Sequence, residues 1–332
     1  MNGAEGTPRR FALRGVAVAA AVLVLLTAAA VWTAPDRLQY VPQAPVPGAD
    51  LDAWLAESEA AAGRIVDGAE KRLRWYENLT GRRSDYVVVY LHGFSATRQE
   101  IAPVPELVAD ALAANLFETR LAGHGLAEAA LNDVRAEDWL DDGAESLAIA
   151  AAIGERIVLI GTSTGATLAL ALADHALFQR VDSVILLSPN LGPSDPSSEW
   201  LLRPAGPLLA RAMVGEYRSW APANEQQARY WSTRYPTAAL VEMMRLVGLV
   251  RARLPLDLAQ PLLTVYSPDD LVVDVDRIRA LEDAISAPRE TFLPLQATGD
   301  PGRHVIAGDI LNAGNNERVA ALIVRFVRGA DL

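Results

Sequence analysis

The sequence predicts an α/β protein with a mainly parallel, doubly wound sheet. Short apolar and β-branched runs alternate with helical patterns from residue 85 onward. The run YVVVYL at 86–91 has no polar alternation, which is typical of a parallel strand buried on both faces. The alternation stops only between Leu191 and Leu258, where the pattern is helical and rich in aromatic residues. These observations indicate one large domain with an insertion between two strands.

Composition restricts the classes of function. Hydrophobic residues make up 51% and charged residues 21% of the 332 residues, which is typical of a globular chain. The formal net charge is −11, and an acidic surface repels phosphate backbones, so nucleic acid is not an expected partner. The chain has no cysteine and therefore no disulfide, zinc–thiolate or iron–sulfur site.

Residues 1–34 have the pattern of a membrane signal. The uncharged stretch 15–34, at about 1.5 Å per residue, is long enough for the roughly 30 Å hydrocarbon core of a bilayer. Arg9, Arg10 and Arg14 favour a cytoplasmic N-terminus, which places everything after Pro35 outside the cytoplasm. Two alternatives stay open. A signal anchor would tether the domain to the membrane, whereas a signal peptide cleaved near the A-x-A pattern would release a secreted or periplasmic protein.

A proline-rich linker is expected at 35–50, because four prolines within 13 residues suit an extended spacer between membrane and domain. The folded domain is expected to span 51–332. Its predicted helices begin at Leu51 and lie at about 100–113, 138–153, 164–177 and 316–329. Its predicted strands lie within 71–77, 86–91, 115–121, 156–161, 183–188, 261–267 and 290–295.

The insertion at about 192–258 is expected to form a helical lid. Ligand sites of parallel sheets lie at the carboxyl ends of the strands, and the insertion emerges there. Most of its tryptophans and tyrosines are expected to pack the lid onto the domain, and some to line an apolar pocket.

The motif G-x-S-x-G occurs as GTSTG at 161–165, directly after a predicted strand and before a predicted helix. This context predicts a sharp turn that exposes the Ser163 hydroxyl as a nucleophile. A Cβ atom at either flanking position would clash in such a turn, which explains Gly161 and Gly165. The N–H of Thr164 lies in the first helical turn, where free donors and the helix dipole favour an oxyanion.

A serine nucleophile needs a base, and the base needs a carboxylate to orient it. His304 is the only one of four histidines that follows both the serine and the strand at 261–267, as the chain order serine, acid, histidine requires. The acid is expected directly after that strand. We prefer Asp270, which the turn at 268–269 would present to the site, and Asp269 is the second choice.

Asp274 and Asp276 are instead expected to cap the following helix. The second oxyanion donor is expected from the loop after the strand at 86–91. There Gly93 allows a close approach of the backbone, and Phe94 supplies the N–H. His92, at the strand end, is expected to have a structural role.

The chain contains five motifs in the following order: LHGF at 91–94, RLAGHG at 120–125, GTSTG at 161–165, SPDDLVV at 267–273 and RHVIAGD at 303–309. In this order the chain, from about Lys71 to its C-terminus, resembles the α/β-hydrolase fold family. It is most similar to the lysophospholipase, monoacylglycerol lipase and carboxylesterase branch. The resemblance implies a Ser163–His304–Asp270 triad, an oxyanion hole from the Phe94 and Thr164 amides, and no metal or organic cofactor.

Thr162 and Arg303 depart from the pattern of this family, in which His or Tyr and Gly are common at the matching positions. Thr162 is expected to affect which ester fits. The sequence thus predicts a serine hydrolase of carboxylic esters, lipid-like or small (EC 3.1.1). Peptidase, thioesterase and acyltransferase activities stay open, as does a non-catalytic, membrane-tethered binding protein with this fold. The oligomeric state is not predicted.

Overall fold

The computed structural model describes residues 7–32, 38–48, 50–127, 130–203 and 205–332. Within these residues the chain builds one seven-stranded sheet in the order β1-β3-β2-β4-β5-β9-β11. All neighbours in it are parallel except β1, which pairs with β3 in the antiparallel sense. The strands are β1 (Arg72–Arg74), β2 (Ser84–Leu91), β3 (Asn115–Glu118), β4 (Gly154–Thr162), β5 (Val181–Leu187), β9 (Leu262–Tyr266) and β11 (Glu290–Pro294). The mainly parallel sheet predicted from the apolar runs is therefore confirmed.

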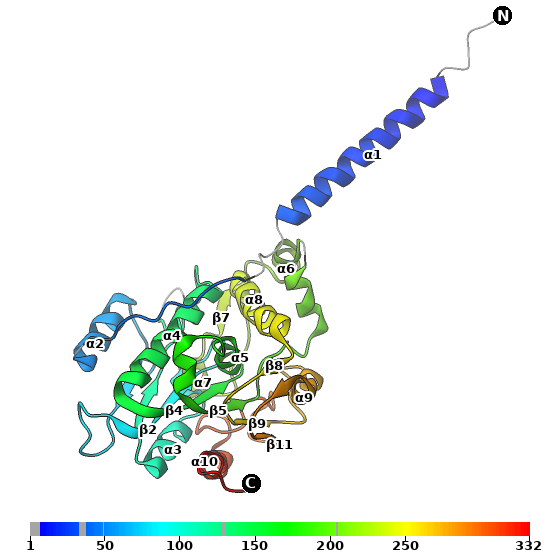
Figure 1. Cartoon of the computed structure of the whole chain (residues 1–332). Coiled ribbons are helices and arrows are strands. Elements are labelled where there is room, and N and C mark those ends of the chain that lie inside the picture. The colour runs from blue at the N-terminus through cyan, green and yellow to red at the C-terminus, as the bar shows by residue number, and fades with distance from the viewer. Residues whose placement is uncertain (1–6, 33–37, 49, 128–129, 204) are drawn as a thin grey trace, which may run out of the picture.

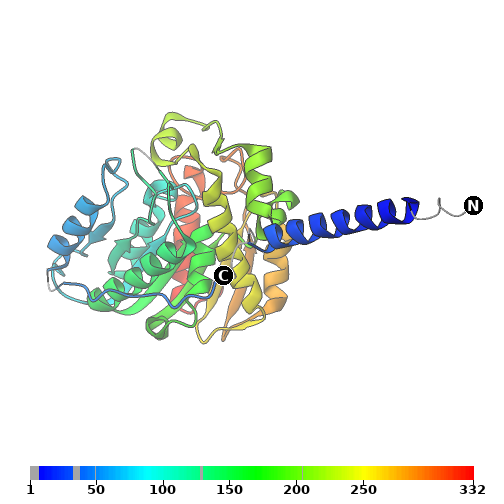
Figure 2. The same ribbon diagram turned by 90° about the horizontal axis from the view of Figure 1, so that it is seen from above.

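Helices cover both faces of this sheet (Figures 1 and 2). On one face Val87 and Val89 of β2 pack with residues of α4 (Ala136–Ile153) and α5 (Thr164–Ala171). On the other face Val88 and Tyr90 pack with α3 (Val104–Leu112) and α10 (Asn316–Val327), which also contact each other. Because β2 is buried on both faces, its sequence lacks polar alternation. The remaining helices of the domain body are α2 (Leu51–Ala61) and α9 (Val275–Ala284).

Between β5 and β9 the chain forms a mostly helical insertion over the carboxyl ends of the strands. It contains α6 (Gly206–Val214), α7 (Glu225–Tyr230), α8 (Thr237–Arg253), the 3-10 turn Pro196–Leu202 and the short antiparallel pair β6 (Tyr217–Ser219) and β7 (Arg234–Pro236). Ion pairs hold it to the body: Arg245 of α8 contacts Glu137 of α4 at 2.8 Å, and Glu199 contacts Arg277 of α9 at 3.0 Å. A further two-stranded pair, β8 (Leu256–Asp257) with β10 (Ile285–Ser286), follows the insertion.

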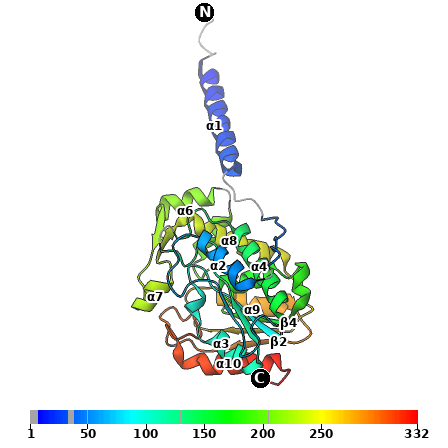
Figure 3. The same ribbon diagram turned by 90° about the vertical axis from the view of Figure 1, so that its left-hand side faces the viewer.

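The N-terminal helix α1 (Thr7–Trp32) extends away from the domain (Figures 1 and 3). Within the described residues, none of the helices combines the length and apolarity that crossing a membrane requires. The membrane span or signal segment expected at 1–34 is therefore not confirmed, and residues 1–6 and 33–34 of it lie outside the described residues.

The described part of the expected linker, 38–48, does not act as a free spacer. Leu38 is buried in the main hydrophobic core. The Tyr40 hydroxyl donates to Asp141 of α4 at 2.7 Å, and the Gln43 N–H donates to the same carboxylate at 2.6 Å. The prolines keep the segment extended, but its other side chains attach it to the domain.

Two element boundaries differ from the sequence pattern. The helix expected at 164–177 ends at Ala171, and a separate 3-10 turn, Ala176–Arg180, leads into β5 with His175 at its N-cap. The helix expected at about 100–113 begins only at Val104, because a 3-10 turn, Arg98–Glu100, precedes it.

Candidate active site

The turn between β4 and α5 has the strained geometry that the sequence predicts. Ser163 lies at φ 52° and ψ −116°, a backbone conformation that non-glycine residues avoid. Holding such a conformation costs about 1–3 kcal/mol, which the surrounding packing must offset. A Cβ atom on Gly161 would lie 2.5 Å from the oxygen of Gly165, and one on Gly165 would lie 2.0 Å from the oxygen of Leu91. The steric explanation of both glycines is confirmed.

Asp270 and His304, 34 positions apart, meet at the carboxyl ends of β9 and β11. His304 Nδ1 lies 2.7 Å from Asp270 Oδ2, and both side chains are buried. The other carboxylate oxygen, Asp270 Oδ1, accepts the N–H groups of Val272 and Val273 at 2.8 and 3.0 Å. Burial by itself lowers the pKa of His304, but the adjacent Asp270 carboxylate, together with the charges of Glu100 and Asp300, raises the pKa above 6.5.

The other aspartates of this loop have different surroundings. Asp269 is exposed. Asp274 caps α9 by accepting from the backbone N–H groups of Asp276 and Arg277. Asp276 does not cap the helix: it lies in the first turn, and its side chain pairs with Arg279 at 3.0 Å. The capping prediction is therefore confirmed for the first of these two and wrong for the second.

Asp300 organises the loop that carries His304, although no sequence motif marks it as a site residue. Its Oδ2 accepts the N–H groups of His304 and Val305, each at 2.9 Å. Its Oδ1 accepts the N–H of Gly302 at 3.0 Å. Arg303 lies between them at φ 54°, in the left-handed region that favours glycine. The Asp-Pro-Gly run at 300–302 is a turn signal that could have revealed this loop.

The two expected oxyanion donors, Phe94 and Thr164, each belong to a segment that lies next to Ser163. Thr164 is the first residue of α5 and follows Ser163 directly. Phe94 follows Gly93, on which a Cβ atom would lie 3.1 Å from Ser163 Cβ. Neither backbone N–H donates to another atom of the described chain. Both are thus free to donate to a bound oxyanion.

Ser163, His304 and Phe94 border one cavity of about 950 Å³. The residues described here form no hydrogen bond between Ser163 Oγ and His304, a contact that often tightens only when substrate binds. The insertion supplies much of the apolar wall, including Trp220, Trp231, Tyr235, Leu240 and Met243. Some of the lid aromatics therefore line a pocket, as expected, while Trp231 and Tyr235 are also buried in the core.

Thr162 does not border this cavity, so its expected effect on which ester fits has no support from a direct contact with the pocket. Its side chain is 1% exposed and lies 3.2 Å from the Tyr90 hydroxyl, inside the sheet. Tyr90 in turn contacts Glu100, a buried carboxyl that does border the cavity. No sequence motif marks Glu100, since a charged residue at the start of the helix expected at about 100–113 is expected to be exposed.

His92 and His124 form a buried pair behind the cavity. His92 Nε2 accepts the N–H of Leu121 at 3.0 Å, and burial lowers the pKa of His92 to about 4. This placement agrees with the structural role expected for His92. Their rings contact each other, and the ring of Phe94 packs against His124.

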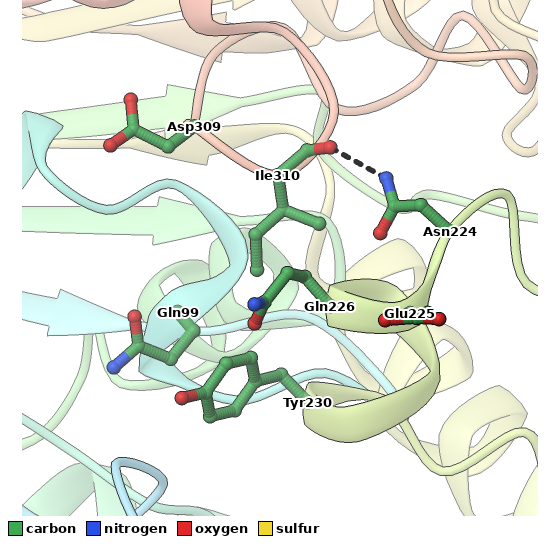
Figure 4. A pocket seen from close by; sticks show the side chains of 7 residues that line it. All are labelled: Gln99, Asn224, Glu225, Gln226, Tyr230, Asp309 and Ile310. Carbon is green, nitrogen blue, oxygen red and sulfur yellow. Dashed lines mark hydrogen bonds between the residues drawn. The ribbon is translucent and has the colours of Figure 1, made fainter.

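A second hollow, of about 620 Å³, lies between α7 and the segment before α10. Figure 4 shows its polar lining and the hydrogen bond that Asn224 Nδ2 donates to the Ile310 oxygen at 2.9 Å. This bond attaches the insertion to the chain segment that follows His304. In the part of the chain that the structure describes, neither hollow contains a cluster of histidine and carboxylate side chains suited to a metal ion.

Residues 88–313 match the alpha/beta hydrolase family. The chain belongs to this family. An alpha/beta hydrolase fold therefore surrounds the cavity, and the family supports hydrolase activity in general. No curated protein shows significant sequence similarity to the chain.

Solved structures of alpha/beta hydrolases share the fold at low sequence identity. A structure from the study of LipS and LipT, two metagenome-derived lipolytic enzymes, is 18% identical with a TM-score of 0.63, covering 80% of this chain and 100% of that one. Monoacylglycerol lipase from Paleococcus ferrophilus is 15% identical with a TM-score of 0.57, covering 78% and 98% of the two chains. A soluble variant of Saccharomyces cerevisiae monoglyceride lipase is 14% identical with a TM-score of 0.53, covering 87% and 98%.

Proposed function

We propose that this alpha/beta hydrolase is a serine hydrolase that cleaves carboxylic esters through an acyl-enzyme. The observation that carries the proposal is that Ser163, on its strained turn, and His304, which contacts Asp270, border one cavity. The names of the lipolytic and monoglyceride lipase structures support ester cleavage as the reaction.

In this mechanism neutral His304 takes the proton of the Ser163 hydroxyl as Oγ attacks the ester carbonyl carbon. The N–H groups of Phe94 and Thr164 stabilise the oxyanion of the tetrahedral intermediate. Protonated His304 gives its proton to the leaving alcohol, and the acyl group stays on Ser163. A water molecule then attacks the acyl carbon, giving its proton to His304, and the carboxylic acid leaves as Ser163 is reprotonated. Asp270 keeps the proton of the neutral imidazole on Nδ1, so that Nε2 is the base.

We propose lipid-like esters as the substrate class. The cavity is of the size that holds a small ligand, and its wall in the insertion is largely apolar. Exposed apolar side chains surround its rim, among them Trp200, Leu209 and Met213, which are 56%, 44% and 82% exposed. These exposed apolar side chains beside the cavity of an acidic protein favour the acyl chain of a lipid over a charged substrate.

The location outside the cytoplasm is proposed on sequence alone. The uncharged stretch 15–34 after three arginines supports a signal anchor, or a signal peptide if the segment is cleaved. Mass spectrometry of the N-terminus of the protein purified from its cells separates the two. An intact N-terminus supports the anchor, a new one near residue 30 supports cleavage, and recovery of the intact chain in the cytosolic fraction contradicts both.

The experiment that tests the function is hydrolysis of p-nitrophenyl esters of graded acyl length by the purified protein and by Ser163→Ala. The wild type should turn over short esters, and the variant should lose about 10⁴-fold or more of this rate while keeping its melting temperature. Absence of turnover by folded wild-type protein would support a non-catalytic binding protein. Equal turnover by the variant would exclude Ser163 as the nucleophile.

A further inference from the structure

A buried carboxyl that the proposed reaction does not use, Glu100, borders the cavity. The residue is 2% exposed, and its Oε2 accepts the N–H of Gly93 at 2.7 Å and the hydroxyl of Tyr90 at 2.8 Å. A Cβ atom on Gly93 would lie 2.7 Å from Glu100 Oε1 and 3.1 Å from Ser163 Cβ. The carboxyl and the nucleophilic residue thus lie against the same glycine.

The hydrogen bonds continue from this carboxyl to the strand of the nucleophile. Tyr90, on β2, has its hydroxyl 3.2 Å from Thr162 Oγ1 at the end of the neighbouring strand β4. Because the single hydroxyl proton of Tyr90 goes to Glu100, Thr162 is the donor in the second bond. One carboxyl therefore connects the loop after β2 with the end of β4.

This connection joins the two segments that carry the proposed oxyanion donors. Gly93 directly precedes Phe94, and Thr162 lies two residues before Thr164. Oxyanion stabilisation depends on donors fixed at about 2.7–3.1 Å from the developing charge, so their relative position determines the rate. We propose that Glu100 is a positioning residue that holds the oxyanion hole together through Gly93 on one side and Tyr90 with Thr162 on the other. The proposal rests on the serine-hydrolase function above and assigns to that site a residue outside the triad.

The negative charge of Glu100 has a second effect, which is on the pKa of His304. The titratable groups that face Glu100 are Tyr90 on β2 and, in the loop after β11, His304 and Asp300. Burial raises the pKa of Glu100 to about 7, although the two donated hydrogen bonds and His304 act against this. Ionised Glu100 in turn contributes to the raised pKa of His304. Removing the charge should therefore lower the pKa of His304.

The test compares Glu100→Gln and Tyr90→Phe with the wild type in the hydrolysis of a short p-nitrophenyl ester. Each rate is divided by the concentration of active sites, which is measured by reaction with a fluorophosphonate probe. We expect each variant to lower kcat about 10-fold with KM changed less than about 3-fold, since removing a whole oxyanion donor costs about 10²–10³-fold. The double variant should lose little more than either single one, because both break the same connection.

The pH profile separates positioning from a merely structural role. His304 must be neutral to act, so kcat/KM falls as the pH drops through its pKa. In Glu100→Gln this acid limb should move to lower pH, because the carboxylate that stabilises protonated His304 is gone. The matched control is Asp142→Asn. Burial also raises the pKa of Asp142 to about 7. Its carboxylate accepts the N–H of Ala122 at 2.6 Å, and the residue does not line the cavity. That control should leave the acid limb in place.

Unchanged kcat in folded Glu100→Gln, or an acid limb that does not move, would overturn the positioning role while leaving the serine-hydrolase function intact. Strictly additive losses in the double variant would also overturn it. A wild type that neither reacts with the probe nor hydrolyses esters would instead overturn the function itself, and this inference with it.

Discussion

The substitution Asp270→Asn tests the link between the buried pair and the chemistry. The 2.7 Å contact between Asp270 Oδ2 and His304 Nδ1 requires a proton on Nδ1, which leaves Nε2 free as the base. In the variant, the carboxamide oxygen can keep the backbone N–H groups now bound to Oδ1, and its NH₂ group then faces Nδ1. A donor at that place stabilises the tautomer with the proton on Nε2, which cannot accept the Ser163 proton.

The loss expected from the wrong tautomer is about 10⁴-fold in kcat, equivalent to about 5.5 kcal/mol of transition-state stabilisation. The assay is steady-state hydrolysis of a short p-nitrophenyl ester, with the melting temperature as a measure of folding. Asp269→Asn is the matched control, since it makes the same change at an exposed neighbour. A folded Asp270→Asn variant within 10-fold of wild type, or an equal loss in the control, would refute the reasoning.

Three further predictions concern the turn, the pH and the rim. Gly165→Ala should destabilise the protein by about 3 kcal/mol or more in urea unfolding, because its Cβ would meet a backbone oxygen at 2.0 Å. Gly314→Ala, where nothing lies within 4 Å of a Cβ atom, should change the midpoint little, and equal effects would contradict the steric explanation. The raised pKa of His304 predicts that kcat/KM falls as the pH drops through a value above 6.5, and a midpoint below 6 would contradict it. Met213→Glu should raise KM at least 10-fold for long-chain esters but not for the acetate. The control Val46→Glu, at a position that is 91% exposed and outside the cavity, should change neither KM. An equal rise for the acetate in Met213→Glu would exclude an acyl-chain role of the rim.

Local patterns were sufficient to predict the sheet and the residues at its carboxyl edge. The unbroken apolar run of β2 required burial on both faces, and GTSTG between a strand and a helix required the sharp turn that the structure shows at Ser163. The order of Asp270 and His304 after two strands of the sheet predicts that they meet. Parallel strands bring their carboxyl ends to one edge, so order along the chain was enough to place them together.

Contacts between distant segments could not be predicted in this way. Glu100 is buried where Tyr90 and Gly93 donate to it, and the helical pattern expected at about 100–113 does not reveal these contacts with the end of β2 and the loop after it. Asp300 positions His304 by accepting hydrogen bonds from backbone N–H groups of its own loop. No periodic sequence pattern predicts the conformation of such a loop. Leu38 is buried in the core although it stands in a proline-rich stretch, because the burial of a single leucine depends on the surface that it meets.

Detection of the acyl-enzyme is the most direct test of the claim that Ser163 is the nucleophile of an ester hydrolase. The protein is mixed with a p-nitrophenyl ester, quenched in acid within the first turnover, digested and analysed by mass spectrometry. The proposed mechanism predicts a burst of p-nitrophenol and an added acyl mass on the peptide that contains Ser163. An acyl group on a different residue, or sustained turnover by Ser163→Ala at the wild-type rate, would contradict it.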